Sequence, residues 1–226
     1  MTETTREPGP TPRPHQGRRP VITREDLIAA ALKLVGPHRS VSTLSLREVA
    51  REAGIAPNSF YRHFRDVDEL AVALIDEAGA ALRKIIGEAR QRASSERSVV
   101  RSSIEAFMEQ LNADEKFLHL LLREGTVGSD AFKQAVERQL GYFEDELCND
   151  LIRLAHTNGS GIHKPALAAR AITRLVFAMG ATAMDMPREQ QPALVDELVS
   201  MLRMIIVGTQ TLAAGTVDES RDRVTR

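Results

Sequence analysis

Residues 45–64 constrain the fold of this chain most, because their pattern predicts two short helices separated by a tight turn. Ser45, with Glu48 three positions later, forms a capping-box pattern in which hydroxyl and carboxylate satisfy the free amides of a helix start. Gly54 can supply the backbone conformation that the turn requires. Pro57 suits the first position of the second helix, where no amide hydrogen is needed. The segment therefore predicts a helix-turn-helix.

The two predicted helices have one apolar face each. On the first, four residues follow helical spacing: Leu46, Val49, Ala50 and Ala53. On the second, Phe60 and Phe64 lie four positions apart and can pack against the first helix. A helical hairpin buried in a core would show the same spacing of apolar residues, but it would not require adjacent polar residues on an exposed side. We therefore expect DNA contact by the polar residues off the apolar face: Asn58, Ser59, Tyr61, Arg62 and His63.

The same stretch resembles the DNA-binding domain of the TetR family of transcriptional regulators. From Ser45 to Leu70 the chain contains Arg-Glu-Val-Ala-Arg-Glu-Ala-Gly-Ile-Ala-Pro and Phe-Tyr-Arg-His-Phe-Arg-Asp-Val-Asp-Glu-Leu. These runs are similar to the subgroup of repressors of unsaturated fatty-acid synthesis and desaturation that includes FabR and DesT. The wider family often has a phosphate-binding lysine near the start of the next helix, where this chain has Asp66 and Asp68. Arg65 or the amino-terminal tail is expected to replace it.

This resemblance implies an all-α fold with a three-helix head and a helical carboxyl-terminal domain for ligand binding and dimerisation. The expected divisions are a Pro-rich basic tail (1–20), the head (21–68), the ligand-binding and dimerisation domain (69–214) and a frayed tail (215–226). The implied partners are a palindromic double-stranded DNA operator and a second copy of the chain. The expected DNA-binding residues are Ser45, Arg47, Asn58, Ser59, Tyr61, Arg62, His63 and Arg65.

Charge is unevenly distributed along the chain. Residues 1–65 hold 11 Lys and Arg against 6 Asp and Glu, whereas residues 66–226 hold 19 against 25. A basic amino-terminal part is suited to phosphate neutralisation. Residues 1–20 contain five prolines and several basic residues, a composition typical of disorder. This tail is either a solvated segment or an arm that follows phosphates or enters a minor groove.

Apolar residues recur at helical spacing along the rest of the chain. A first helix is expected from Thr23 to about Val35, with Thr23 and Asp26 forming a capping box at its start. A long fourth helix is expected to begin at Asp66, with Glu69 completing a capping box. Its predicted buried stripe consists of Leu70, Leu74, Ala78, Leu82 and Ile85. This helix is expected to be the only continuous element that joins the head to the body, and five further helical patterns follow from about residue 96.

Apolar and aromatic residues of the body either form an ordinary core or line a tunnel for an acyl chain. The subgroup resemblance favours the tunnel, because it implies regulation by long-chain acyl-CoA or acyl carrier protein thioesters. Arg123 and Glu124 are candidates for polar contacts at its mouth, and Arg170 and Arg174 form either a phosphate contact or surface ion pairs. The expected ligand-binding residues are Phe107, Met108, Leu111, Phe117, Leu121, Arg123, Phe143, Phe177 and Ala181.

The last two predicted helices indicate a dimer. The one from Lys164 to about Met184 is rich in alanine and glycine, and the next carries a strongly apolar stripe. Small residues allow close helix approach, and the resemblance implies that each subunit gives both helices to a four-helix interface. The alternative is that both helices pack only on their own core.

No catalytic or metal-binding motif is found among the six histidines, and no glycine-rich phosphate loop or nucleophile elbow occurs. No cofactor and no enzyme activity are expected. Cys148 is the only cysteine, which favours a cytoplasmic location, and no membrane-spanning run or signal peptide is predicted.

The sequence thus predicts a repressor of fatty-acid biosynthesis or desaturase genes. Two alternatives remain open: a repressor of an efflux or catabolic operon that responds to another lipophilic compound, and a helical acyl-binding carrier.

Overall fold

The computed structural model describes residues 22–35, 39–92, 96–113 and 117–224, and in these ranges the chain is helical with no extended β-strand. The predicted all-α fold is confirmed. The first twenty residues, to which the sequence assigns the basic tail, lie outside the described ranges.

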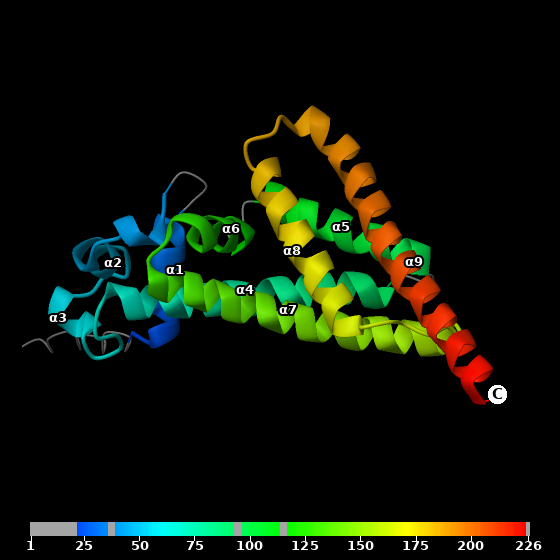
Figure 1. Cartoon of the computed structure of the whole chain (residues 1–226). Coiled ribbons are helices and arrows are strands. Elements are labelled where there is room, and N and C mark those ends of the chain that lie inside the picture. The colour runs from blue at the N-terminus through cyan, green and yellow to red at the C-terminus, as the bar shows by residue number, and fades with distance from the viewer. Residues whose placement is uncertain (1–21, 36–38, 93–95, 114–116, 225–226) are drawn as a thin grey trace, which may run out of the picture.

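The amino-terminal helices form a compact head at one end of the molecule (Figure 1). Its α-helices are α1 (Arg24–Leu34), α2 (Leu46–Glu52) and α3 (Pro57–Phe60), with a short 3-10 turn, η1 (Val41–Thr43), between the first two. Helix α4 (Val67–Arg92) then leaves the head and runs the length of the body.

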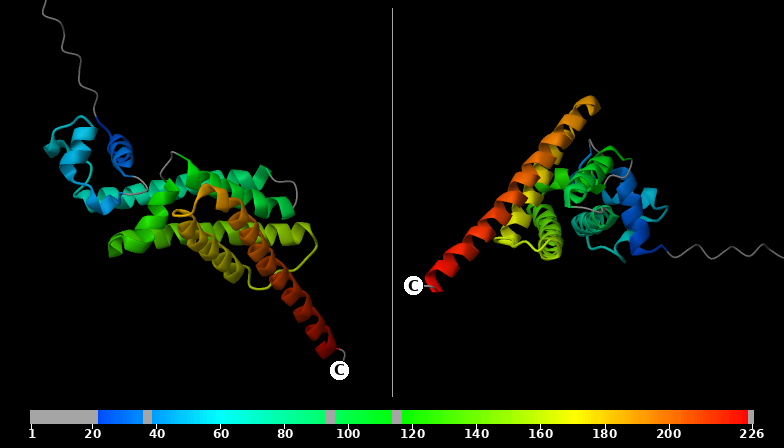
Figure 2. Two further views of the ribbon diagram at one scale, coloured as in Figure 1. Left: turned by 90° about the horizontal axis from the view of Figure 1, so that it is seen from above. Right: turned by 90° about the vertical axis from the view of Figure 1, so that its right-hand side faces the viewer.

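The body packs around α4 and the long helix α7 (Asp130–Thr157). Its other helices are α5 (Glu96–Asn112), α6 (Phe117–Val127), α8 (Pro165–Ala183) and α9 (Gln191–Val224), with a 3-10 turn, η2 (Arg188–Gln190), before the last. Figure 2 shows α8 and α9 as a layer on one side of the body, with the carboxyl end of α9 projecting beyond it. Helix α9 continues past Gly215, where the sequence predicted fraying.

The predicted caps fix where the head helices begin. Thr23 and Asp26 form a reciprocal capping box at α1, and Ser45 and Glu48 do the same at α2. At α4 the prediction was only half right. The Asp66 carboxylate accepts a hydrogen bond from the Glu69 amide at 2.7 Å, but the Glu69 carboxylate accepts from the amide of Arg65 instead of that of Asp66.

One continuous hydrophobic core extends through head and body. The predicted stripe on α4 is buried from Leu70 to Leu82, but its last member is Ile86, and Ile85 is only half-buried. Four-residue spacing from Leu82 leads to Ile86, so the helix keeps its register to the end of the stripe.

By length and composition alone, α8 and residues 188–215 would be able to cross a membrane, although the sequence predicted no such run. Core helices of soluble proteins pass the same test. In this fold both pack on the rest of the body, α8 on α7 and α9 on α5.

Candidate nucleic-acid interface and ligand cavity

The turn between α2 and α3 depends on Gly54. Its φ of +69° lies in the left-handed region, where a side chain is strained. The amide of Ile55 donates to the carbonyl of Ala50 at 2.9 Å, which closes the turn onto α2. Pro57 then occupies the first turn of α3, as its fixed φ predicts.

The second helix of the motif is shorter than its pattern indicates. Helix α3 ends at Phe60, and a series of turns continues to Phe64, with the amide of His63 donating to the carbonyl of Phe60 at 2.9 Å. Phe60 and Phe64 are fully buried with ring centroids 5.8 Å apart. The guanidinium of Arg24 lies 4.2 Å from the centre of the Phe64 ring and covers it from α1.

Burial of the two phenylalanines leaves the polar residues between them on the outside. Tyr61 is 61% exposed, and most of the other residues predicted to bind DNA are exposed as well. Ser59 and His63 are half-buried. The exposed residues are Ser45, Arg47, Asn58, Tyr61, Arg62 and Arg65.

Two of these candidates already have a partner within the head. The Ser45 hydroxyl is occupied by the α2 cap, since it donates to a Glu48 carboxylate oxygen at 2.9 Å. Hydrogen bonds from Arg39 and then Ser45 hold the pKa of Glu48 below its ordinary value, so this carboxylate is charged at neutral pH. Arg65 pairs with Glu69 at 3.1 Å but remains 87% exposed, and its guanidinium is accessible to a phosphate.

A buried carboxylate ties the head to the body. Glu124, on α6, is fully buried and accepts hydrogen bonds from the Ser40 hydroxyl at 2.7 Å and the Val41 amide at 2.9 Å. Its Oε1 is thus engaged with the head, and the expected contact of Glu124 with a ligand at a tunnel mouth stays a prediction. Helix α4 is the continuous element between head and body, as expected, and α6 adds a non-covalent contact between them.

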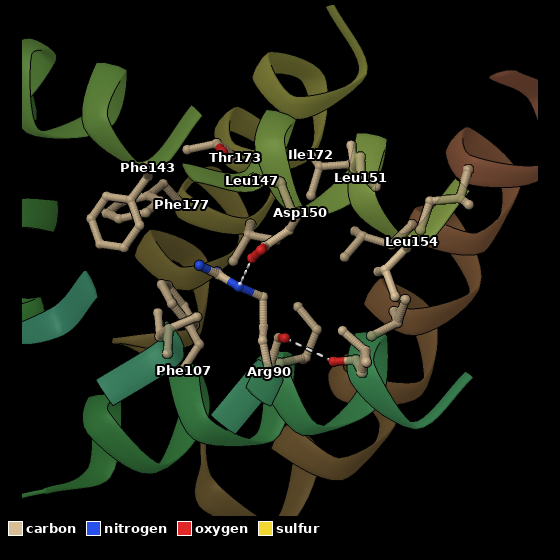
Figure 3. A pocket seen from close by; sticks show the side chains of 18 residues that line it. Arg90, Phe107, Phe143, Leu147, Asp150, Leu151, Leu154, Ile172, Thr173 and Phe177 are labelled. Atoms are coloured by element: carbon tan, nitrogen blue, oxygen red, sulfur yellow. Dashed lines mark hydrogen bonds and ion pairs between the residues drawn. The ribbon is translucent and has the colours of Figure 1, made fainter. Parts of the chain in front are cut away.

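An apolar cavity of about 100 Å³ lies inside the body between α4, α5, α7, α8 and α9 (Figure 3). Three of the predicted ligand-binding residues line it: Phe107, Phe143 and Phe177. Their rings meet edge to face, with the Phe177 centroid 5.5 Å from that of Phe107 and 5.3 Å from that of Phe143. Aliphatic side chains, including Ile104, Leu151 and others, complete the wall.

The other predicted ligand-binding residues lie elsewhere. Met108, Leu111 and Leu121 are buried in the surrounding core, and Met108 also lines a surface groove between α5 and α9. The remaining three are half-buried outside the cavity: Phe117, Arg123 and Ala181.

Sequence reasoning missed the polar residues of the cavity, which are Arg90, Ser103, Asp150 and Thr173. A signal for Arg90 was present, because Leu82, Ile86 and Arg90 continue the α4 stripe at four-residue spacing and end it on a cation. Figure 3 shows the Arg90 side chain reaching from α4 toward Asp150.

Arg174 is engaged within the subunit. It pairs with Glu137 at 2.7 Å and Glu144 at 2.8 Å, both on α7, and these bonds raise the pKa of its guanidinium while lowering that of Glu137. The ion-pair interpretation of this arginine is therefore the one that the contacts favour.

Exposed apolar side chains gather on α8 and α9. Leu167 is 60% exposed on α8, and Met204, Val207 and Leu212 are between 58% and 72% exposed on α9. Exposed apolar groups on adjacent helices are typical of a surface that another protein covers.

Within the described ranges, no group of three or more His, Cys, Asp or Glu residues could hold a metal ion. The capped helix-turn-helix has an outward polar segment and is joined to a helical body with an apolar cavity. Residues 27–74 match the family model described as bacterial regulatory proteins, tetR family. The matched residues span the head and the first two turns of α4, so this part of the chain is similar to the regulators of that family.

Solved structures share this fold at low sequence identity. A putative transcriptional regulator from Pseudomonas aeruginosa PAO1 has a TM-score of 0.63 and 18% identity, covering 83% of this chain and 90% of that one. The fatty acid degradation regulator FadR from Bacillus halodurans has a TM-score of 0.65 and 16% identity, covering 82% and 96%. Reduced NemR from E. coli has a TM-score of 0.59 and 18% identity, covering 80% and 96%.

Proposed function

We propose that this chain is a homodimeric cytoplasmic repressor of fatty-acid biosynthesis or desaturase genes, which responds to long-chain acyl-CoA or acyl carrier protein thioesters. The observation that carries the proposal is the apolar, aromatic-lined cavity at the centre of the body. The subgroup resemblance of residues 45–70 supports the fatty-acid assignment. So does the similar fold of FadR from Bacillus halodurans, a fatty acid degradation regulator.

The size of the cavity supports a conformational response. Drug-sized ligands occupy pockets of roughly 300–1,000 Å³, whereas this cavity measures about 100 Å³. A long acyl chain therefore has to displace side chains and move helices to enter. A ligand that requires this change binds the expanded conformation of the body more tightly than the conformation with the small cavity. Unequal affinity for two conformations is the condition for shifting their populations.

In the proposed arrangement, residues 21–68 bind DNA and residues 69–214 bind ligand and dimerise. Tyr61 and Arg62 reach base edges or phosphates, and Arg47, Asn58 and Arg65 add backbone contacts. The exposed faces of α8 and α9 pair with those of a second copy, which places two heads on a palindromic operator.

Salt dependence tests the DNA-binding part. If about six phosphates are neutralised, affinity for a short palindromic operator should fall by roughly a thousandfold between 50 and 200 mM salt. Arg62→Ala should weaken operator binding without changing the circular dichroism spectrum, since this side chain is exposed. Arg92→Ala, which makes the same charge change at the far end of α4, is the matched control. A salt-independent lack of binding would instead favour an acyl-binding carrier.

Gel-shift titrations with saturated and unsaturated acyl-CoA test the ligand. The response should disappear in Val176→Trp, which fills the cavity from α8, and persist in Ile152→Trp on the exposed side of α7. If no acyl-CoA changes operator affinity of the unmodified protein, the fatty-acid assignment gives way to an efflux or catabolic repressor.

A further inference from the structure

Arg90 stands at the opening of the apolar cavity. Its side chain is only 10% exposed. It lines both the cavity and a neighbouring surface groove, and these two hollows also share Val99, Asp150 and Leu154. The Arg90 guanidinium therefore lies where a molecule entering from the groove would leave its polar end (Figure 3).

The charges around Arg90 do not balance. Its Nε lies 2.7 Å from an Asp150 carboxylate oxygen, and its terminal nitrogen lies 3.7 Å from Glu146. Asp150 also pairs with Arg153 at 2.7 Å, and Glu146 also pairs with Arg83 at 3.2 Å. Three guanidinium groups thus share two carboxylates, and the cluster carries one positive charge in excess.

The Arg90 guanidinium is also incompletely hydrogen-bonded. Among the described residues, no acceptor forms a hydrogen bond with its buried Nε–H, because the close Asp150 oxygen is not aligned with that bond. Burying a charged donor without full hydrogen bonding is costly. A carboxylate placed in the plane of the guanidinium would satisfy two donors at once.

We propose that Arg90 binds the carboxylate of an unesterified amphipathic acid, such as a medium- or long-chain fatty acid, whose apolar part lies among Phe107, Phe143 and Phe177. When the ligand carboxylate pairs with Arg90, Asp150 remains paired with Arg153 and Glu146 remains paired with Arg83. Neither protein carboxylate is then left without a cation. The free acid is a ligand class beyond the thioesters proposed above, in which the carbonyl at this depth is uncharged. This inference rests on the proposed role of the cavity as the ligand site.

Binding of length-matched ligands tests it. Dodecanoate and dodecanol, used below their aggregation limits, are compared by isothermal titration calorimetry on the full-length protein at pH 7.5. The unmodified protein should prefer dodecanoate by roughly tenfold or more, the expected contribution of hydrogen bonds to a charged group. Arg90→Gln should abolish this preference, while Arg92→Gln, whose parent side chain is 75% exposed on the same helix, should retain it.

A second variant is expected to increase the affinity for dodecanoate, an effect that misfolding cannot explain. Asp150→Asn removes the carboxylate that competes for Arg90 and should tighten dodecanoate binding without tightening dodecanol binding. Equal affinity for acid and alcohol in the unmodified protein would overturn the inference, as would a preference that survives Arg90→Gln. The operator assay is separate: dodecanoate binding through Arg90 with no acyl-dependent change on DNA would overturn the fatty-acid regulator and leave the carboxylate site standing.

Discussion

Glu124 shows what a single residue contributes when it lies between two parts of the molecule. Its carboxylate meets a hydroxyl and an amide that are 84 and 83 positions away in the chain. On the sequence it is one charged residue after a leucine run, with nothing to separate a buried acceptor from a surface group. Only the packing of α6 beside the head gives it this role, so no local pattern could have predicted it.

Replacing Glu124 by Ala should destabilise the protein by about 1–3 kcal/mol, because the buried Val41 amide then has no acceptor. Urea unfolding measures the loss. Glu124→Gln keeps a carbonyl oxygen at the same place and should lose less. Equal stability of the alanine variant and the unmodified protein would show that water or another group replaces the carboxylate.

At the scale of single elements, local signals predicted helix starts better than helix ends. Caps at Thr23 and Ser45 depend on residues three positions apart, which a sequence displays directly. The end of α3 depends on how Phe60 and Phe64 enter the core, and the pattern alone extended that helix too far. The residues of the cavity wall were harder to predict than the helix ends. Phe107, Phe143 and Phe177 were predicted as ligand-binding residues, but which helix faces meet around a cavity is decided by packing across five helices.

Two glycine substitutions should have opposite effects on stability. Gly54→Ala places a side chain at φ +69° and should cost about 1 kcal/mol, even though no atom lies within 4 Å of the new Cβ. Gly141→Ala, inside α7 with the same open surroundings, should stabilise by about 0.5–1 kcal/mol. Thermal unfolding of both variants checks this. If Gly54→Ala were neutral, the turn would not need its left-handed conformation.

At the scale of the whole molecule, the packing of a single chain leaves apolar side chains of α8 and α9 exposed to solvent. Met204→Glu, at a side chain 72% exposed, should weaken self-association by placing a charge in the proposed dimer interface. Sedimentation velocity measures the association. Ile152→Glu introduces the same charge at an exposed apolar residue of α7 and should leave the dimer intact. A monomeric unmodified protein would contradict the proposed interface.

The bond between Glu124 and the η1 region has a geometrical consequence for how the head can move. A body held by one flexible joint can swing about many axes, and each further contact reduces this freedom. The head is held by its continuity with α4, by the packing of α1 and η1 on α4, and by the hydrogen bonds from Glu124, so a displacement of α6 is expected to turn the head with it. In the proposed two-fold symmetric pair, the same displacement of α6 in both subunits would turn both heads and change the separation and orientation of the two recognition segments together.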